Sequence, residues 1–245
     1  MYRFFVEKEQ IGDGEIRITG SDVNHIKNVL RLKIGEKLTV SDGSNVAYFG
    51  EVAEYLPDEV LIRVNEVQEG KHELPSRITL FQGLPKGDKM DLIVQKCVEL
   101  GVAEIIPVKM ERCIVKLDSK KETNRLKRWN AISESAAKQA KRMFIPEVCP
   151  CMSFEEALEA QKSFDIRLLP YELAEGMEGS RKILSKIPKG SSISILIGPE
   201  GGITKEEVTK AMDIGMIPIT LGRRILRTET AGMALMAILS YLLDD

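Results

Sequence analysis

The sequence has few of the residues and patterns that mark the commonest functional sites. It contains two histidines and four cysteines, and Cys97, Cys113, Cys149 and Cys151 do not have the paired spacing of a zinc site. We therefore expect no metal and reduced thiols. The chain has neither a Gly-Lys-Ser/Thr phosphate loop nor a complete G-x-G-x-x-G fingerprint, which argues against a nucleoside triphosphate or dinucleotide site.

Long apolar runs and a leader-like N-terminus are also missing. The longest apolar stretch, residues 231–243, is shorter than the roughly 20 residues that a membrane-spanning helix needs. The opening residues have no apolar core ahead of small cleavage-site residues. We therefore expect a cytoplasmic protein without membrane contact. The 245 residues suit two modest domains or one large one, and 43% hydrophobic and 29% charged residues are typical of a folded chain.

The net charge is only −2, but cations gather between residues 109 and 142, a segment that we call the basic strip. Its members are Lys109, Arg112, Lys116, Lys120, Lys121, Arg125, Lys127, Arg128, Lys138, Lys141 and Arg142. The strip is either a solvated helix face or a contact with a phosphate backbone, since clustered cations release counterions from a polyanion. Trp129 within it either stacks on a base or anchors its helix to the core.

The first 72 residues have the pattern of a small β-barrel. β-Branched and aromatic residues form five short runs, and turn residues separate them. These runs cover residues 2–6, 15–19, 36–42, 46–56 and 59–67. One helix is expected over Asp22–Leu30, with Ser21 as its cap. The polar segment Gln68–Ser76 is the expected linker.

Residues 73–245 alternate short apolar strands with amphipathic helices, which predicts a parallel sheet with helices on both faces. The expected strands cover residues 78–83, 103–110, 165–172, 193–198 and 217–222. A helix over residues 89–100 has Asp88 as its expected cap and ends at Gly101. Capping boxes start two further helices, Ser153 with Glu156 and Thr204 with Glu207.

Two of these strands end in glycine-marked turns at Gly198 and Gly222. Ligands bind at such strand ends in open α/β sheets. Together with Gly201 and Gly202, these glycines would let the backbone approach a flat, polar ligand. Tight turns without a ligand are the alternative interpretation.

Four blocks of the sequence resemble one family in order: residues 84–102, 138–148, 197–204 and 221–231. They are similar to the bacterial ribosomal RNA methyltransferases of the SPOUT class that modify N3 of one uridine in small-subunit RNA. Residues 25–43 resemble the N-terminal segment of that family. The resemblance implies an S-adenosylmethionine pocket in a C-terminal trefoil knot, an N-terminal PUA-like RNA-binding barrel and a homodimer. Arg223 stands where many members have proline.

The resemblance places the cofactor pocket in the loops after three strands. The candidate pocket residues are Leu169, Pro170, Tyr171, Ile197, Gly198, Pro199, Glu200, Gly201, Gly202, Leu221, Gly222, Ile225, Leu226 and Thr230. The candidate contacts to small-subunit ribosomal RNA are His25, Asn28, Arg31, Arg112, Arg125, Lys127, Arg128, Lys138 and Arg142.

Methylation of uracil N3 requires loss of the imide proton, and the resulting charge spreads over two carbonyl oxygens. A nearby cation favours that anion, and Arg227 is the first candidate. Glu229 and Glu200 are candidate catalytic proton acceptors, because residues 73–245 contain no histidine. Alternatively, Glu200 only orients its turn, and Glu229 pairs with an arginine or caps the final helix. A ribose 2′-O-methyltransferase and a non-catalytic RNA-binding assembly factor remain the alternative functions.

Overall fold

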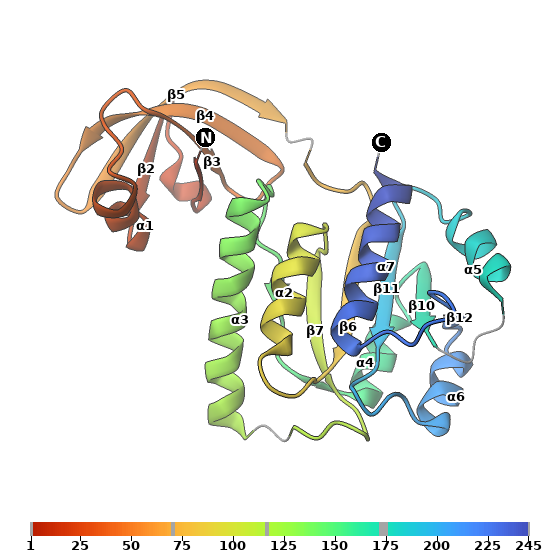
Figure 1. The fold of residues 1–245 in the computed structure, drawn as a ribbon. Helices are drawn as coiled ribbons and strands as arrows, with labels where there is room; N and C mark the ends of the chain where they lie inside the picture. Colours follow the sequence, from red (N-terminus) through yellow and green to blue (C-terminus); the bar gives the residue numbers. More distant parts are fainter. Residues whose placement is uncertain (1, 70–71, 116–117, 172–175, 245) are drawn as a thin grey trace. The chain divides into compact units, whose positions relative to one another are not determined.

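The computed structural model describes residues 2–69, 72–115, 118–171 and 176–244, and these form two compact units (Figure 1). The first unit takes in the chain up to Glu73 together with residues 137–145. The second takes in residues 74–136 and the chain from Pro146 onward. A short segment from the middle of the sequence therefore belongs to the N-terminal unit. The domain division expected at residue 72 remains a prediction.

The first unit is built on one five-stranded sheet in the order β1-β3-β4-β5-β2. Its strands are β1 (Tyr2–Phe5), β2 (Glu15–Thr19), β3 (Lys37–Ser41), β4 (Val46–Tyr55) and β5 (Glu59–Glu69). β1 pairs with β3 in parallel, and the other pairs are antiparallel. All five strands were expected. A closed barrel is not confirmed, because β1 and β2 are edges that do not pair with each other among the described residues, which leaves a half-barrel.

The helix expected over residues 22–30 is a short α1 (Ser21–Asn24) that continues as a π-helical segment, η2 (His25–Leu30). The cap assigned to Ser21 was wrong. Gly20 occupies that position with φ 71°, and Ser21 is already the first helical residue. Ile26 is fully buried and holds the segment against the sheet core. A short 3₁₀ turn, η1 (Lys8–Gln10), completes the unit.

The second unit has a sheet in which every pair is parallel, as predicted. The strand order is β12-β10-β11-β6-β7-β8, and β9 also pairs with β7. The strands are β6 (Arg77–Gly83), β7 (Glu104–Lys109), β8 (Glu147–Val148), β9 (Met152–Ser153), β10 (Ile166–Pro170), β11 (Ser192–Ile197) and β12 (Ile217–Ile219). β8 and β9 were not predicted, because a strand of two residues is too short to show a periodic pattern.

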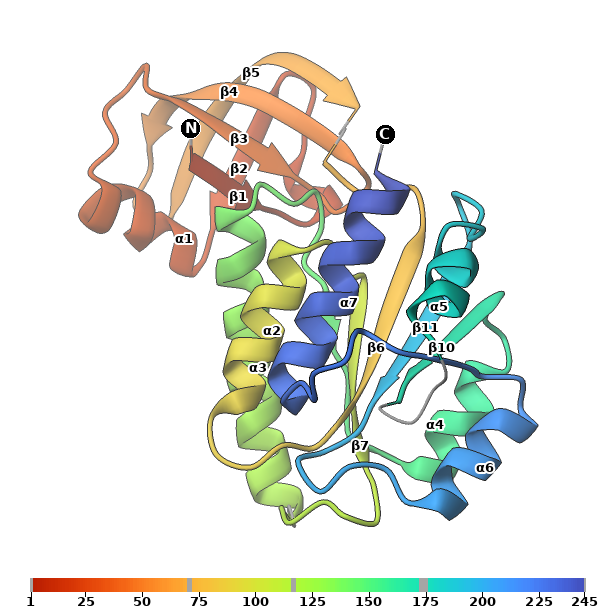
Figure 2. The ribbon, with the colours of Figure 1, turned by 45° about the vertical axis from the view of Figure 1, so that its right-hand side comes forward.

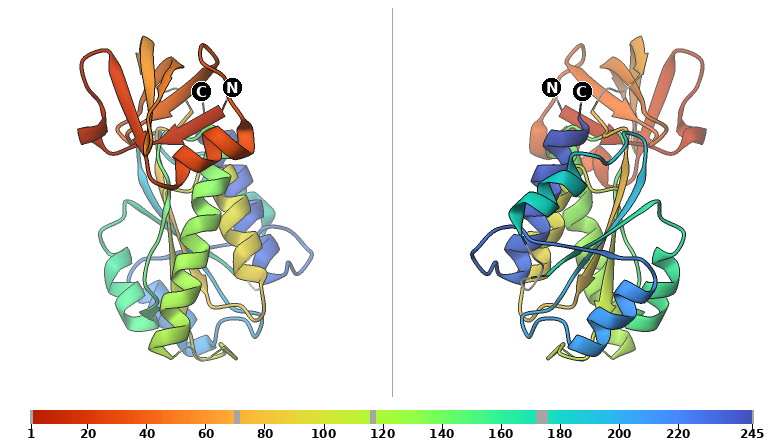
Figure 3. Two further views of the ribbon diagram at one scale, coloured as in Figure 1. Left: turned by 90° about the vertical axis from the view of Figure 1, so that its left-hand side faces the viewer. Right: turned by 90° about the vertical axis from the view of Figure 1, so that its right-hand side faces the viewer.

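Helices cover both faces of this sheet, with α2 and α7 on one face and α4 and α6 on the other (Figure 3). The helices are α2 (Lys89–Glu99), α3 (Ser119–Gln139), α4 (Phe154–Gln161), α5 (Met177–Leu184), α6 (Lys205–Asp213) and α7 (Thr228–Leu243). The capping boxes of α4 and α6 are confirmed. Asp88 precedes α2 as expected, but its side chain makes no capping hydrogen bond. None of the described helices is both long and apolar enough to cross a membrane.

The basic strip lies largely on α3, where Trp129 is only 2% exposed. The interpretation of Trp129 as an anchor to the core is therefore confirmed, and the side chain is not available to stack on a base.

After β12, at the edge of the sheet, the chain returns across the carboxyl ends of the strands to begin α7 (Figure 2). α7 packs against α2 and β11. Its first turn therefore lies at the carboxyl ends of the central strands β6 and β11, where the candidate site is formed.

Candidate active site

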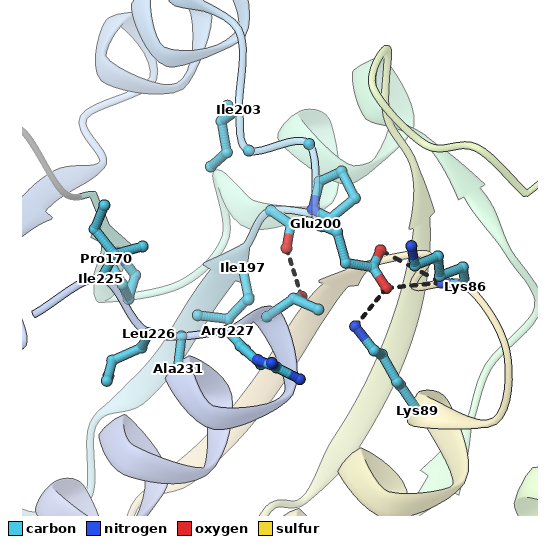
Figure 4. A pocket seen from close by; sticks show the side chains of 15 residues that line it. Lys86, Lys89, Pro170, Ile197, Glu200, Ile203, Ile225, Leu226, Arg227 and Ala231 are labelled. Carbon is cyan, nitrogen blue, oxygen red and sulfur yellow. Dashed lines mark hydrogen bonds and ion pairs between the residues drawn. The ribbon is translucent and has the colours of Figure 1, made fainter.

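A cavity of about 670 Å³ opens at the carboxyl ends of β10 and β11, beside the first turn of α7 (Figure 4). This volume is within the roughly 300–1,000 Å³ range of small-molecule sites. The lining residues are Lys86, Lys89, Pro170, Ile197, Gly198, Pro199, Glu200, Gly201, Gly202, Ile203, Ile225, Leu226, Arg227, Thr228 and Ala231. Four segments that are distant in the sequence thus meet around one space.

Most of the expected cofactor residues line this cavity or a smaller hollow of about 80 Å³ that shares Pro170, Ile225 and Leu226 with it. Tyr171, Leu221 and Gly222 line the smaller hollow. Two expected residues line neither space. Leu169 is fully buried in the sheet core, and Thr230 is exposed on α7.

The glycines of the turn after β11 are explained partly by contacts within the protein. A Cβ at Gly201 would lie 2.8 Å from the Cβ of Arg112, and one at Gly198 would lie 2.6 Å from Cγ1 of Ile203. A side chain at Gly201 would therefore displace Arg112, which explains a glycine at this position. A Cβ at Gly202 would have no neighbour closer than 3.9 Å, so the φ of 73° at this residue is what requires glycine.

Thr228 connects the first turn of α7 to two strand ends. Its Oγ1 donates a hydrogen bond to the carbonyl of Gly198 at 2.6 Å and accepts one from Nε2 of Gln82 at 2.9 Å. Gln82 Nε2 also donates to the carbonyl of Gly83. Because Thr228 is only 6% exposed, these bonds fix the start of α7 firmly. No motif in the sequence pointed to Gln82 as part of the site.

Glu200, which lines the cavity, and Glu229, which does not line it, share one ammonium group. Lys89 Nζ lies 2.9 Å from Glu200 Oε1 and 3.4 Å from Glu229 Oε2. The backbone amide of Lys86 also donates to Glu200 (Figure 4). Lys86 and Lys89 were not predicted as site residues, although both lie in the 84–102 block.

The pKa values of Glu200 and Lys89 favour the ionised forms of these two residues. Desolvation acts to raise the pKa of Glu200, but hydrogen bonds from Lys89 and from backbone amides, with the Lys89 charge, hold that pKa below its usual value. The hydrogen bond to Glu200 is the main cause of a raised pKa at Lys89. Glu200 is therefore a stabilised carboxylate, which suits the orienting role better than the role of a proton acceptor.

Arg227 occupies the N-cap position of α7, and its exposed side chain lines the cavity on the same side as Lys89 (Figure 4). Within the described residues it forms no ion pair, whereas Lys89 pairs with two carboxylates. Arg227 is thus a cation available to an anion in the cavity. The partner of Glu229 is a lysine and not the arginine that one alternative expected.

Several candidate RNA contacts have other partners within their own unit. Arg142 is 3% exposed and pairs with Glu73, and Lys138 pairs with Asp22 at 3.0 Å. Burial makes Arg142 unavailable to a phosphate, so that assignment was wrong. Arg128 pairs with Asp91, and Arg112 donates to the carbonyl of Gly201.

The remaining RNA candidates are accessible. His25, Asn28 and Arg31 are exposed at η2 and just after it. Arg125 is half-buried and Lys127 exposed on α3, and neither forms an ion pair among the residues that the structure describes. Lys116 lies outside the described residues. No group of three or more metal-ligating His, Cys, Asp or Glu side chains occurs in the described part of the chain.

Comparison with known proteins assigns a class to this fold and site. Residues 72–240 match the RNA methyltransferase domain family, and residues 18–64 match the RNA methyltransferase PUA domain. The architecture is therefore that of an RNA methyltransferase with a PUA-type RNA-binding domain.

Individual relatives make the class more specific. The chain is 37% identical to ribosomal RNA small subunit methyltransferase E of Bacillus subtilis, over 98% of this chain and 96% of that one. It is 32% identical to the protein of the same name from Mesomycoplasma hyopneumoniae, over 96% and 97%. The crystal structure of the Neisseria gonorrhoeae protein of that name, bound to S-adenosyl methionine, is 33% identical and superposes with a TM-score of 0.85, over 99% and 98%. This chain belongs to the ribosomal RNA small subunit methyltransferase E family.

Proposed function

We propose that this protein transfers a methyl group from S-adenosylmethionine to N3 of a uridine in small-subunit ribosomal RNA, in the cytoplasm. The observation that supports the chemistry is Arg227, which forms no ion pair among the described residues and lines a ligand-sized cavity formed by four chain segments. The family supports the substrate class and the cofactor.

The residues of the cavity suit this cofactor. Ile197, Ile225 and Leu226 offer apolar contact to a flat base, and the backbone of residues 198–202 offers polar groups beside them. Polar and apolar contacts of this kind are typical of cofactor sites. The cofactor supplies an electrophilic methyl group, so this chain has only to position the uracil and remove its N3 proton.

Two charged residues at the start of α7, Arg227 and Glu229, have different roles in this reaction. Arg227 stabilises the negative charge that develops on the uracil carbonyl oxygens as the proton leaves. Glu229, in the first turn of the same helix, accepts the proton. Glu200 is held by Lys89 and by the amide of Lys86, and it fixes the turn after β11.

Mass mapping of modified nucleosides tests this function. The purified protein is incubated with labelled S-adenosylmethionine and small subunits that lack the modification. We expect label in 3-methyluridine at one position. Label in a 2′-O-methylated nucleoside would support the ribose-modifying alternative, and binding of RNA without transfer of label would support a non-catalytic assembly factor.

We propose that Arg125 and Lys127, with the exposed η2 residues, contact RNA phosphates. Replacing both cations with glutamine should weaken RNA binding and lower the slope of log K against log salt by roughly 0.7 to 0.9 per lost contact. Arg128→Gln is the matched control, because Arg128 already pairs with Asp91. Filter binding over a series of salt concentrations measures both effects. An unchanged slope in the double variant would mean that the strip is a solvated face.

We propose that the protein is a homodimer through α5 and α7. These helices line an apolar hollow of about 520 Å³, and Tyr241 on α7 is 86% exposed. A second copy would bury this surface, since large apolar patches on a soluble protein mark interaction sites. Light scattering should report a dimer at micromolar concentration and a monomer for Tyr241→Asp. A monomeric wild-type protein with full activity would contradict the proposal.

We also propose that the return of the chain from β12 to α7 completes a trefoil knot of the SPOUT type. The path across the sheet and the bonds of Thr228 to two strand ends support it. An experimental density map tests the proposal, since the crossing order of residues 220–228 over the β10 and β11 loops decides whether the chain is knotted.

A further inference from the structure

Lys89 is a charged residue of the cavity that no motif in the sequence indicated. It is the first residue of α2, whereas its two partners belong to the turn after β11 and to the first turn of α7. A single ammonium group therefore joins three segments that all line the site. Its side chain is 27% exposed, and those of Glu200 and Glu229 are 21% and 13% exposed.

The two carboxylates depend on this cation to different degrees. Glu200 also accepts hydrogen bonds from the backbone amide of Lys86. Glu229 Oε2 is buried and makes no hydrogen bond among the described residues, so the ion pair with Lys89 is its compensation there. A buried carboxylate without a partner is costly and takes up a proton more readily. Two carboxylates beside each other without a cation would also repel, and one would then hold a proton.

We propose that Lys89 is a positioning residue whose ammonium group holds the carboxylate of Glu229 next to the cavity-lining Thr228, ready to accept the uracil proton, while Glu200 shares the same cation. This inference rests on the proposed function, because it takes Glu229 as the proton acceptor. Other charged or titratable groups that the described residues place at this site include Lys86, Arg227, Arg112, Cys113 and Glu207. Lys86, Arg112 and Arg227 also contribute positive charge to the electrostatic potential at the two carboxylates. Lys89 is the cation that pairs with both of them.

The pH dependence of the chemical step tests the proposal. Single-turnover rates are measured against pH at saturating cofactor, with unmodified small subunits as substrate. In Lys89→Met the acidic limb of the profile should move to higher pH by about one to three units, the usual effect of losing an opposite charge at close range. Lys89→Arg keeps the charge, and its acidic limb should stay close to that of the wild type.

Two further variants separate this effect from simple structural damage. Glu200→Gln leaves Lys89 to Glu229 alone and removes the neighbouring negative charge, so the acidic limb should move to lower pH. In Lys89→Met/Glu200→Gln the limb should return part of the way to its wild-type position. Loss of packing alone would give neither the opposite shift nor the partial return. Because Glu200→Gln keeps the lysine, it still tests the proposal if Lys89→Met does not fold.

The outcomes distinguish the proposal from the function on which it rests. A wild-type protein that transfers no methyl group to the small subunit refutes the proposed function. An active wild type, with acidic limbs that coincide in Lys89→Met, Glu200→Gln and the unaltered protein, refutes the role of Lys89 alone.

Discussion

Replacing Arg227 with alanine should slow methyl transfer by roughly two to three orders of magnitude, the range for loss of one preorganised donor. The side chain forms no ion pair among the described residues and lines the cavity, so its removal leaves no buried carboxylate unpaired. Cofactor affinity and thermal stability should therefore change little. A loss confined to the rate is what removal of an interaction made only in the transition state produces.

The pH dependence of the Arg227→Ala variant gives a second test. Raising the pH should restore part of the rate of this variant. The variant lacks the cation that stabilises the uracil anion, and a higher hydroxide concentration favours loss of the N3 proton instead. Arg223→Ala is the matched control, since Arg223 is exposed in the same loop and lines neither hollow. Rates at saturating cofactor are compared over a range of pH. A wild-type rate at neutral pH in Arg227→Ala would remove this residue from the mechanism.

Replacing Glu73 with alanine should lower the free energy of unfolding by about 3 to 5 kcal/mol, as expected when one member of a buried ion pair is removed. Its carboxylate accepts hydrogen bonds from Nε of Arg142 at 3.0 and 2.8 Å and from the amide of Met143 at 2.6 Å. Arg142 is only 3% exposed, so the variant would leave a guanidinium buried without this carboxylate.

Urea denaturation of the full chain measures this loss. Glu54→Ala is the control in the same unit, because Glu54 is exposed on β4 and should change the stability by no more than about 0.5 kcal/mol. A loss below about 1 kcal/mol in Glu73→Ala would show that water or other groups compensate Arg142 once the carboxylate is gone.

Local patterns in the sequence were enough to predict most of the architecture. Alternating β-branched and aromatic residues located all five strands of the first unit, and the capping boxes at Ser153 and Thr204 located the starts of α4 and α6. The parallel sheet followed from the alternation of strand and helix. The open edge between β1 and β2 could not be predicted, because barrel closure depends on which strands pair and not on their individual patterns.

The parts of the candidate site that consist of consecutive residues were predicted. The parts that depend on contacts between residues distant in the sequence were missed. The turns after β11 and β12 were recognised from their glycines, and the resemblance to the family added the turn after β10. Lys89 could not be, since a lysine at the start of a helix is ordinary until the structure shows the two carboxylates beside it. Arg142 was misassigned for the same reason, because its neighbours in the sequence suggest a basic surface and its partner, Glu73, is distant in the chain.

The inclusion of residues 137–145 in the first unit has a consequence for synthesis on the ribosome. The sheet strands of that unit are complete by Glu69, but Lys138, Arg142 and Met143, which bond to Asp22, Glu73 and Ser41, come much later. At about 5 to 20 residues per second, the roughly 70 intervening residues take roughly 4 to 14 s to make. The nascent half-barrel must wait that long with the carboxylate of Glu73 unpaired. Most of the methyltransferase sheet is still unmade when the half-barrel receives its last segment.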